Sequence, residues 1–365
     1  MKFINKYLRN LAPYKVASHK VWEVSDENRK SILKLDWNES TIPPTPKVKE
    51  RLLKLVNNED IYYLYPSTNN QEILQRLSIY TKLPLDNIQY FASSDSLHEY
   101  LVRMYITVGD PILVLGPTYD NFRLTSQAQG AAVHYYNYQP DFTLDEQGFI
   151  NKITDLSPSL VYICNPNNPS GSLLTKDYIK KFLIPFPDIL FLIDEAYFEF
   201  SGETMADQVI NFPNLFVSRT FSKAFALANF RAGYLISDVN NIQQISKIRN
   251  PKNFTSFAQE AVLGVLSDID YMESYVENVL KSREIFSNEL KKMDFVKQVF
   301  HSEANFILVE FVDFDWKMKV FNYLNENNVF VRNLLHSEML INTLRITIGT
   351  DVQMELVTKL INEVK

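Results

Sequence analysis

Between residues 111 and 236 the chain alternates short apolar runs with segments of helical periodicity, and this alternation limits the folds that it can adopt. The apolar runs occupy positions 111–115, 132–136, 160–164, 189–193, 215–217 and 233–236. Continuous apolar runs are typical of strands covered on both faces, and alternation with helices is typical of parallel sheets. The pattern therefore predicts an α/β fold, in which a large domain has a mostly parallel sheet sandwiched by helices.

The pattern changes after Asn250-Pro251. Helical periodicity then dominates, with strand-like runs near the end of the chain at 305–311, 329–332 and 343–348. This mixture predicts a second, smaller α+β domain. A chain of 365 residues also exceeds the usual size of a single core. We expect a large domain over residues 31–250, and a small domain made of residues 1–30 and 251–365.

Composition excludes several classes of protein. Hydrophobic residues make up 46% of the chain, so a packed core is expected rather than disorder. The net charge of −6 comes from mixed charges without a basic block, which argues against a nucleic-acid partner. The single cysteine, Cys164, fits a reducing compartment, and neither a secretory signal nor an apolar stretch long enough to span a membrane is found. We expect a cytoplasmic protein with no membrane partner and no metal site.

Polar residues follow three of the predicted strands. Asn168 follows the strand at 160–164, Asp194 follows the next, and Lys223 follows the strand at 215–217. The carboxyl ends of parallel strands meet at one edge of a sheet, where ligands collect. Each residue has an ordinary explanation when taken alone, as a turn asparagine, a capping aspartate or a surface lysine. Together they predict a site that contains an amide, a carboxylate and an amine.

The residues around Lys223 suit an aldehyde cofactor that carries a phosphate. A lysine can form an imine with an aldehyde, and burial or nearby positive charge favours its reactive neutral amine. Thr220 and Ser222 can donate hydrogen bonds to phosphate oxygens, and Arg231 can bind them in bidentate fashion.

At this point the chain resembles the fold type I pyridoxal-phosphate enzymes, and among them the histidinol-phosphate aminotransferase family. The motifs that carry the resemblance are Asn167-Asn-Pro-Ser-Gly171, Asp194-Glu-Ala-Tyr197 and Ser222-Lys223 with Arg231, in the order of the family. The similarity extends from Leu11-Ala-Pro-Tyr14 to the Leu344–Thr350 segment. It implies pyridoxal 5'-phosphate as the cofactor and aminotransfer as the reaction.

The resemblance also implies roles for individual residues. Lys223 would anchor the cofactor and move protons, and Asp194 would pair with its pyridine nitrogen. Tyr197 and Asn168 would hydrogen-bond the 3-oxygen of the ring, and Tyr119 would stack on the ring face.

Two further groups of residues are implied for the phosphate and the substrate. The cofactor phosphate would lie at a helix start, where backbone amides favour an anion; its ligands would be Ser94, Asp95, Thr220, Ser222 and Arg231. Tyr65 matches an aromatic residue that reaches the phosphate from a partner subunit, which implies a homodimer. The substrate anion would be bound by Arg345, with Arg332 and Tyr14 as further candidates.

The chain departs from the family at several positions. It has only nine glycines, Ala92-Ser-Ser-Asp95 lacks the usual glycine, and Asn38-Glu-Ser40 lacks the usual proline. The catalytic set is retained while the substrate-facing arm differs, so we expect retained chemistry with a changed substrate. The hypothesis is transfer from glutamate to a small phosphorylated ketone, either dihydroxyacetone phosphate, which gives serinol phosphate, or imidazole acetol phosphate, which gives histidinol phosphate.

Two alternatives remain open on the sequence. One is a pyridoxal-phosphate-dependent decarboxylase of phosphothreonine or phosphoserine, which shares the fold and cofactor. The other is a non-catalytic, cofactor-binding regulatory protein, since fold alone does not determine function.

Overall fold

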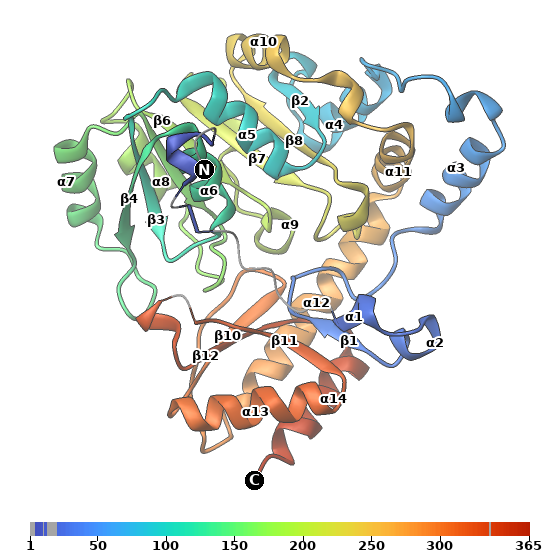
Figure 1. Ribbon diagram of the computed structural model, residues 1–365, viewed down its shortest axis with the longest axis vertical. Coiled ribbons are helices and arrows are strands. Elements are labelled where there is room, and N and C mark those ends of the chain that lie inside the picture. Colours follow the sequence, from blue (N-terminus) through green and yellow to red (C-terminus); the bar gives the residue numbers. More distant parts are fainter. Residues whose placement is uncertain (1–3, 10, 13–19, 336) are drawn as a thin grey trace.

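The computed structural model describes residues 4–9, 11–12, 20–335 and 337–365, and the described chain contains two sheets. Figure 1 shows the larger sheet and its helices above the smaller one. The long helix α12 (Ile269–Leu290) joins the two parts, because it contacts elements on both sides.

The larger sheet has seven strands in the order β2-β8-β7-β6-β5-β3-β4. The neighbours β7-β6-β5-β3-β4 are parallel, whereas β8 runs antiparallel to both β7 and β2. Six of the seven strands were predicted from the apolar runs, and the mostly parallel sheet is confirmed. The strands are β2 (Ile88–Phe91), β3 (Pro111–Gly116), β4 (Ala132–Asn137), β5 (Leu160–Cys164), β6 (Leu190–Asp194), β7 (Leu215–Thr220) and β8 (Gly233–Ser237).

Helices cover both faces of this sheet, as the continuous apolar runs require. On one face Leu101, Phe122 and Ile245 pack against Leu192 and its neighbours. On the other face Phe149, Phe182 and Leu77 belong to the main hydrophobic core. The helices of this part are α3 (Pro46–Val56), α4 (Gln71–Thr81), α5 (Ser94–Tyr105), α6 (Asn121–Gln129), α7 (Glu146–Leu156), α8 (Lys176–Leu183), α9 (Phe198–Ser201), α10 (Val239–Ile248) and α11 (Ser256–Leu266).

The smaller sheet has five strands in the order β1-β11-β12-β10-β9. Only the β1–β11 pair is parallel. Its strands are β1 (Leu33–Leu35), β9 (Val296–Val299), β10 (Phe306–Phe311), β11 (Val329–Asn333) and β12 (Thr343–Thr347). Helices α12 and α13 (Phe314–Glu326) pack against these strands, and α14 (Asp351–Asn362) packs against α12 and α13.

The remaining described helices are short. They are α1 (Lys20–Glu23), α2 (Asp26–Arg29), η1 (Lys6–Leu8), η2 (Glu59–Tyr62), η3 (Leu85–Asn87), η4 (Ala206–Gln208), η5 (Ala228–Phe230), η6 (Pro251–Asn253) and η7 (Glu338–Leu340).

The division into domains at residues 31 and 250 stays a prediction, and sheet membership suggests a refinement. Strand β1 pairs with β11 of the smaller sheet, although it was assigned to the large domain. Helix α11 contacts α3 and α4, although it was assigned to the small domain. Periodicity identifies a helix or a strand but not its partner, so these two contacts could not be predicted from the sequence.

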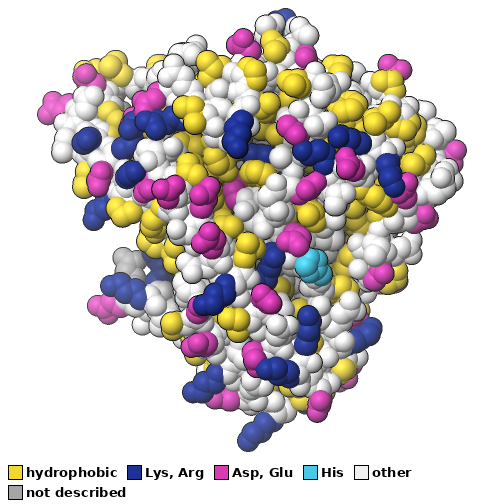
Figure 2. Space-filling model, turned by 180° about the vertical axis from the view of Figure 1, so that it is seen from behind, with side chains coloured by type: hydrophobic (Ala, Val, Ile, Leu, Met, Phe, Trp, Pro, Cys, Tyr) yellow, Lys and Arg dark blue, Asp and Glu magenta, His cyan; other side chains and the backbone are white. Residues whose placement is uncertain are grey.

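The described surface carries charges of both signs. Figure 2 shows acidic and basic side chains interspersed over one face. Among the helices of the described residues, none combines the length and the apolar character needed to cross a bilayer.

Candidate active site

Lys223 lies in the loop after β7. Its Nζ donates a hydrogen bond to the backbone carbonyl of Trp37 at 2.9 Å. Burial lowers the pKa of Lys223 to about 8, and the Arg345 guanidinium adds to the effect. A substantial fraction of this amine is therefore neutral just above neutral pH, as a nucleophilic lysine requires.

Asp194 ends β6 and is buried. Its register partners are Cys164 on β5 and Ser218 on β7. The hydroxyl of Tyr162 donates to Oδ2 at 2.8 Å, and the hydroxyl of Ser218 donates to Oδ1 at 3.2 Å. Each carboxylate oxygen can accept a second hydrogen bond, so the carboxylate can still bind the N–H of a ring.

Tyr197 and Asn168, which were predicted to act together, lie side by side. Asn168 Nδ2 donates to the Tyr197 hydroxyl at 3.3 Å, and Asn38 Nδ2 donates to the same oxygen at 2.9 Å. Burial raises the pKa of Tyr197, so the phenol stays protonated. Because its oxygen accepts two N–H groups, the hydroxyl proton is left to donate.

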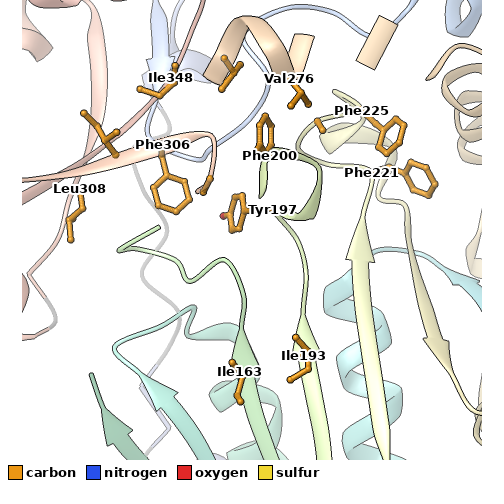
Figure 3. Close-up of a cluster of buried hydrophobic side chains, with 14 of the residues drawn as sticks. Ile163, Ile193, Tyr197, Phe200, Phe221, Phe225, Val276, Phe306, Leu308 and Ile348 are labelled. Atoms are coloured by element: carbon orange, nitrogen blue, oxygen red, sulfur yellow. The ribbon is translucent and has the colours of Figure 1, made fainter. Parts of the chain in front are cut away.

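Tyr197 also marks the junction of the two sheets. Figure 3 shows it between the strands that carry Ile163 and Ile193 and the ring of Phe306 on β10. The Tyr197 and Phe306 rings meet edge to face, with centroids 5.1 Å apart. This packing fixes the orientation of the phenol.

Helix α5 begins at the predicted phosphate site. Ser93 caps it by accepting a hydrogen bond from the Ser96 amide, and takes a left-handed φ of 93°. A Cβ on Gly233 would lie 2.7 Å from the Ser94 amide nitrogen, so only glycine allows β8 to approach the helix this closely. The first amides of α5 are available to bind an anion.

Arg231 and Asp95 lie together at this helix start. Arg231 Nη2 is 3.0 Å from Asp95 Oδ2, and the Tyr119 hydroxyl donates to Asp95 Oδ1 at 3.1 Å. The predicted stacking of Tyr119 on the ring of a cofactor stays a prediction. Thr220 and Ser222, which precede Arg231 in the chain, are both buried. The Ser222 amide donates a hydrogen bond to Thr220 Oγ1 at 3.1 Å.

Arg345 lies on β12, the middle strand of the smaller sheet. Its Nη2 donates to the Asp36 carbonyl at 2.6 Å, and its Nη1 donates to Asn168 Oδ1. Arg332 is its register partner on β11, so both arginines project from the same face of the sheet. The structure therefore brings Arg345 into contact with the asparagine that was predicted to bind the cofactor.

One predicted residue, Tyr65, is not brought to this site within the described chain. Tyr65 is 76% exposed, and the Lys252 ammonium lies 4.5 Å from the centre of its ring. Its predicted role requires a partner subunit. Tyr14 lies outside the described residues.

Sequence reasoning missed the segment Asp36-Trp37-Asn38. Its consecutive carbonyls accept hydrogen bonds from Arg345, Lys223 and Asn305. Asn38 has a left-handed φ of 57°, which asparagine tolerates better than most residues. In the sequence this segment is marked by a polar run directly before a proline-rich loop. That pattern does not show which residues the segment would contact.

The assembled groups fit pyridoxal phosphate. They offer an amine for its aldehyde, a carboxylate for its ring nitrogen, a phenol and an amide for its 3-oxygen, and a helix start with an arginine for its phosphate. Gly233 adds no side chain that would meet the Ser94 amide at this helix start. No cluster of potential metal ligands occurs in the described ranges of the chain.

Comparisons with known proteins agree with this geometry. A family model described as aminotransferase class I and II matches residues 30–363. A dihydroxyacetone phosphate transaminase of Campylobacter jejuni is 38% identical over 372 aligned residues, covering 98% of this chain and 96% of the relative. A histidinol-phosphate aminotransferase of Ruminiclostridium cellulolyticum is 32% identical over 323 residues, covering 88% and 89%.

A solved structure shares the fold over the full length. The histidinol-phosphate aminotransferase of Sinorhizobium meliloti, in complex with pyridoxal 5'-phosphate, superposes with a TM-score of 0.88 at 23% identity. The match covers 100% of this chain and 99% of the other. The predicted fold type I architecture is confirmed.

Proposed function

We propose that this chain, which belongs to the class I and II aminotransferase family, transfers the amino group of glutamate to a small phosphorylated ketone. Its relatives are transaminases, and pyridoxal 5'-phosphate is the cofactor. The amino donor and the acceptor are our proposal.

The position of Arg345 supports this proposal, because its guanidinium contacts Asn168 and the Asp36 carbonyl, next to the Trp37 carbonyl that binds Lys223. A guanidinium on the smaller sheet reaches Asn168 of the larger sheet and lowers the pKa of the Lys223 amine. A substrate anion bound by Arg345 would place its reacting carbon beside that amine. Arginine binds both carboxylates and phosphates, so one side chain serves glutamate and a phosphorylated ketone in turn.

The chemistry divides between the cofactor and this chain. When bound, pyridoxal phosphate supplies the aldehyde that carries the amino group and a ring that withdraws electrons from the substrate carbon. Lys223 would hold the cofactor and then move a proton at the substrate carbon, for which an amine with a pKa of about 8 is suited. Asp194 would hold the positive charge at the ring nitrogen, and Tyr197 with Asn168 would donate to the 3-oxygen.

The phosphate of the cofactor would be held by the first amides of α5 at Ser94, by Thr220 and Ser222, and by Arg231. In this proposal the Arg231–Asp95 ion pair orients the guanidinium toward the helix start. Tyr65, which is exposed here, would reach the phosphate of a second copy in a homodimer.

Dihydroxyacetone phosphate is the favoured acceptor. The relative named for that substrate is 38% identical, whereas the histidinol-phosphate aminotransferase is 32% identical. The departures at Ala92-Ser-Ser-Asp95 and Asn38-Glu-Ser40 also point away from the histidinol-phosphate type.

The test is a substrate assay on the cofactor-loaded protein. Glutamate is supplied with dihydroxyacetone phosphate or with imidazole acetol phosphate, and formation of 2-oxoglutarate is measured. We expect faster turnover with dihydroxyacetone phosphate, and activity on neither ketone would overturn the phosphate-substrate proposal. Carbon dioxide release from phosphothreonine or phosphoserine would indicate the decarboxylase instead, and unchanged cofactor absorbance with every donor would indicate a non-catalytic protein.

A further inference from the structure

Asp194 is held by hydrogen bonds that involve three buried polar side chains, those of His98, Ser218 and Tyr162. His98 Nε2 of α5 lies 2.9 Å from Ser218 Oγ of β7, and Ser218 Oγ lies 3.2 Å from Asp194 Oδ1. Tyr162 of β5 donates to the other carboxylate oxygen at 2.8 Å. His98, Ser218 and Tyr162 are at most 1% exposed. Bulk water therefore does not compete for these bonds.

The direction of the hydrogen bonds follows from counting protons. An ionised carboxylate only accepts, so the single hydroxyl proton of Ser218 is donated to Asp194. The Ser218 oxygen must then accept from His98, which requires a proton on His98 Nε2. His98 Nδ1 is buried and has no hydrogen-bond partner among the described residues. A proton there would be a buried donor without an acceptor, so the neutral imidazole with its proton on Nε2 is the form that fits.

The surroundings hold this arrangement rigid. The rings of Phe122 and Tyr162 stack with centroids 4.4 Å apart, and the His98 ring meets both edge on, at 5.8 Å and 5.9 Å. In such an apolar site each hydrogen bond in a chain polarises the next one. The Asp194 charge is thus stabilised by donors from two directions.

We propose that His98 and Ser218 are positioning residues that set the strength with which Asp194 holds the ring nitrogen of the cofactor. This inference rests on the proposed role of Asp194. It goes further, because it assigns a function to Ser218, which contacts Asp194, and to His98, which contacts Ser218. His98 also lies one helical turn after Ser94, so α5 supports both the phosphate end and the ring end of the cofactor.

Nitrogen NMR of the ring gives a direct test that does not depend on turnover. The protein is loaded with pyridoxal phosphate labelled with ¹⁵N in the ring, whose chemical shift distinguishes a protonated from an unprotonated nitrogen. Ser218→Ala and His98→Leu should each move the signal toward the unprotonated value and weaken cofactor binding. We expect kcat to fall about tenfold or more in Ser218→Ala, since a hydrogen bond to a charged group is lost, while KM changes little. Ser218→Thr, which keeps the hydroxyl, should restore most of the signal.

Two controls separate the His98–Ser218–Asp194 relay from a general disturbance of the core. Ser237→Ala removes another fully buried hydroxyl, on the neighbouring strand β8, and should leave the ring signal unchanged. If Asp194→Asn changes the signal but folded Ser218→Ala and His98→Leu proteins do not, the relay is wrong while the role of Asp194 stands. If Asp194→Asn itself leaves the signal unchanged, the proposed role of Asp194 fails, and the relay fails with it.

Discussion

Replacing Arg345 with glutamine tests whether the charge of this proposed substrate-anion ligand and the Lys223 amine are electrostatically coupled. The pKa of Lys223 is lowered from 10.5 to about 8, first by burial and next by the Arg345 charge. The substitution removes the charge and leaves the burial in place. A neighbouring charge shifts a pKa by about one unit or more at close range, so we expect the pKa of Lys223 to rise to roughly 9. This corresponds to ~1.4 kcal/mol of charge repulsion.

The assay uses protein stripped of cofactor, so that the amine is free. Modification of Lys223 by an amine-specific reagent is followed by peptide mass spectrometry as a function of pH. The rate should show an inflection near pH 8 in the parent protein and about one unit higher in Arg345→Gln. Arg332→Gln removes the same charge from the adjacent strand and should move the inflection less.

An inflection that stays in place in folded Arg345→Gln would refute the coupling. The loaded variant should also show a higher KM for both glutamate and the phosphorylated ketone. We expect at least a tenfold rise, because a charge-assisted hydrogen bond to the substrate is lost. A rise for only one of the two substrates would show that they use different anion sites.

Further predictions concern Lys223, Gly233 and Tyr65. In Lys223→Ala, borohydride treatment should no longer add the mass of the cofactor to the intact protein, although circular dichroism stays unchanged. Between pH 8 and 10.5 the unfolded Lys223 binds more protons than the folded one, so the apo-protein should become more stable as pH rises, by at most ~3.4 kcal/mol. Lys223→Met should flatten that slope in denaturant titrations. Gly233→Ala should cost about 1–3 kcal/mol in the same titrations and weaken cofactor binding, because its Cβ would meet the Ser94 amide at 2.7 Å. Mixing inactive Tyr65→Ala with inactive Lys223→Ala should restore some activity if Tyr65 acts across a dimer, and no recovery would place its role within one chain.

The larger sheet was predictable because most of its strands are buried on both faces and are therefore rich in apolar residues, although the edge strand β4 has no buried residue. Strand β3 has five of its six residues buried, and the runs that predict β5 to β8 are similar. Strand β1 was not predicted, since three residues carry no periodicity and its partner, β11, lies far along the chain.

In the candidate site, too, some groups can be predicted from local sequence patterns and others cannot. The sequence predicts Lys223, Asp194 and Asn168 as site residues because each follows an apolar run at one sheet edge. The Trp37 and Asp36 carbonyls could not be found in this way, because any residue supplies a carbonyl and only the fold places it. The contact between His98 and Ser218 could not be predicted, because a polar residue inside an apolar pattern does not reveal whether another polar residue faces it.

The register of β1 with β11 has a consequence for how the enzyme is made. Leu33 pairs with Val329, so this contact joins positions 296 residues apart. The Asp36–Asn38 carbonyls directly follow β1, and they cannot be fixed in space until β11 has left the ribosome. Pairing over so long a stretch of chain is slow. The Lys223 amine therefore gains its carbonyl partner late, only after β11 has been synthesised and has paired with β1.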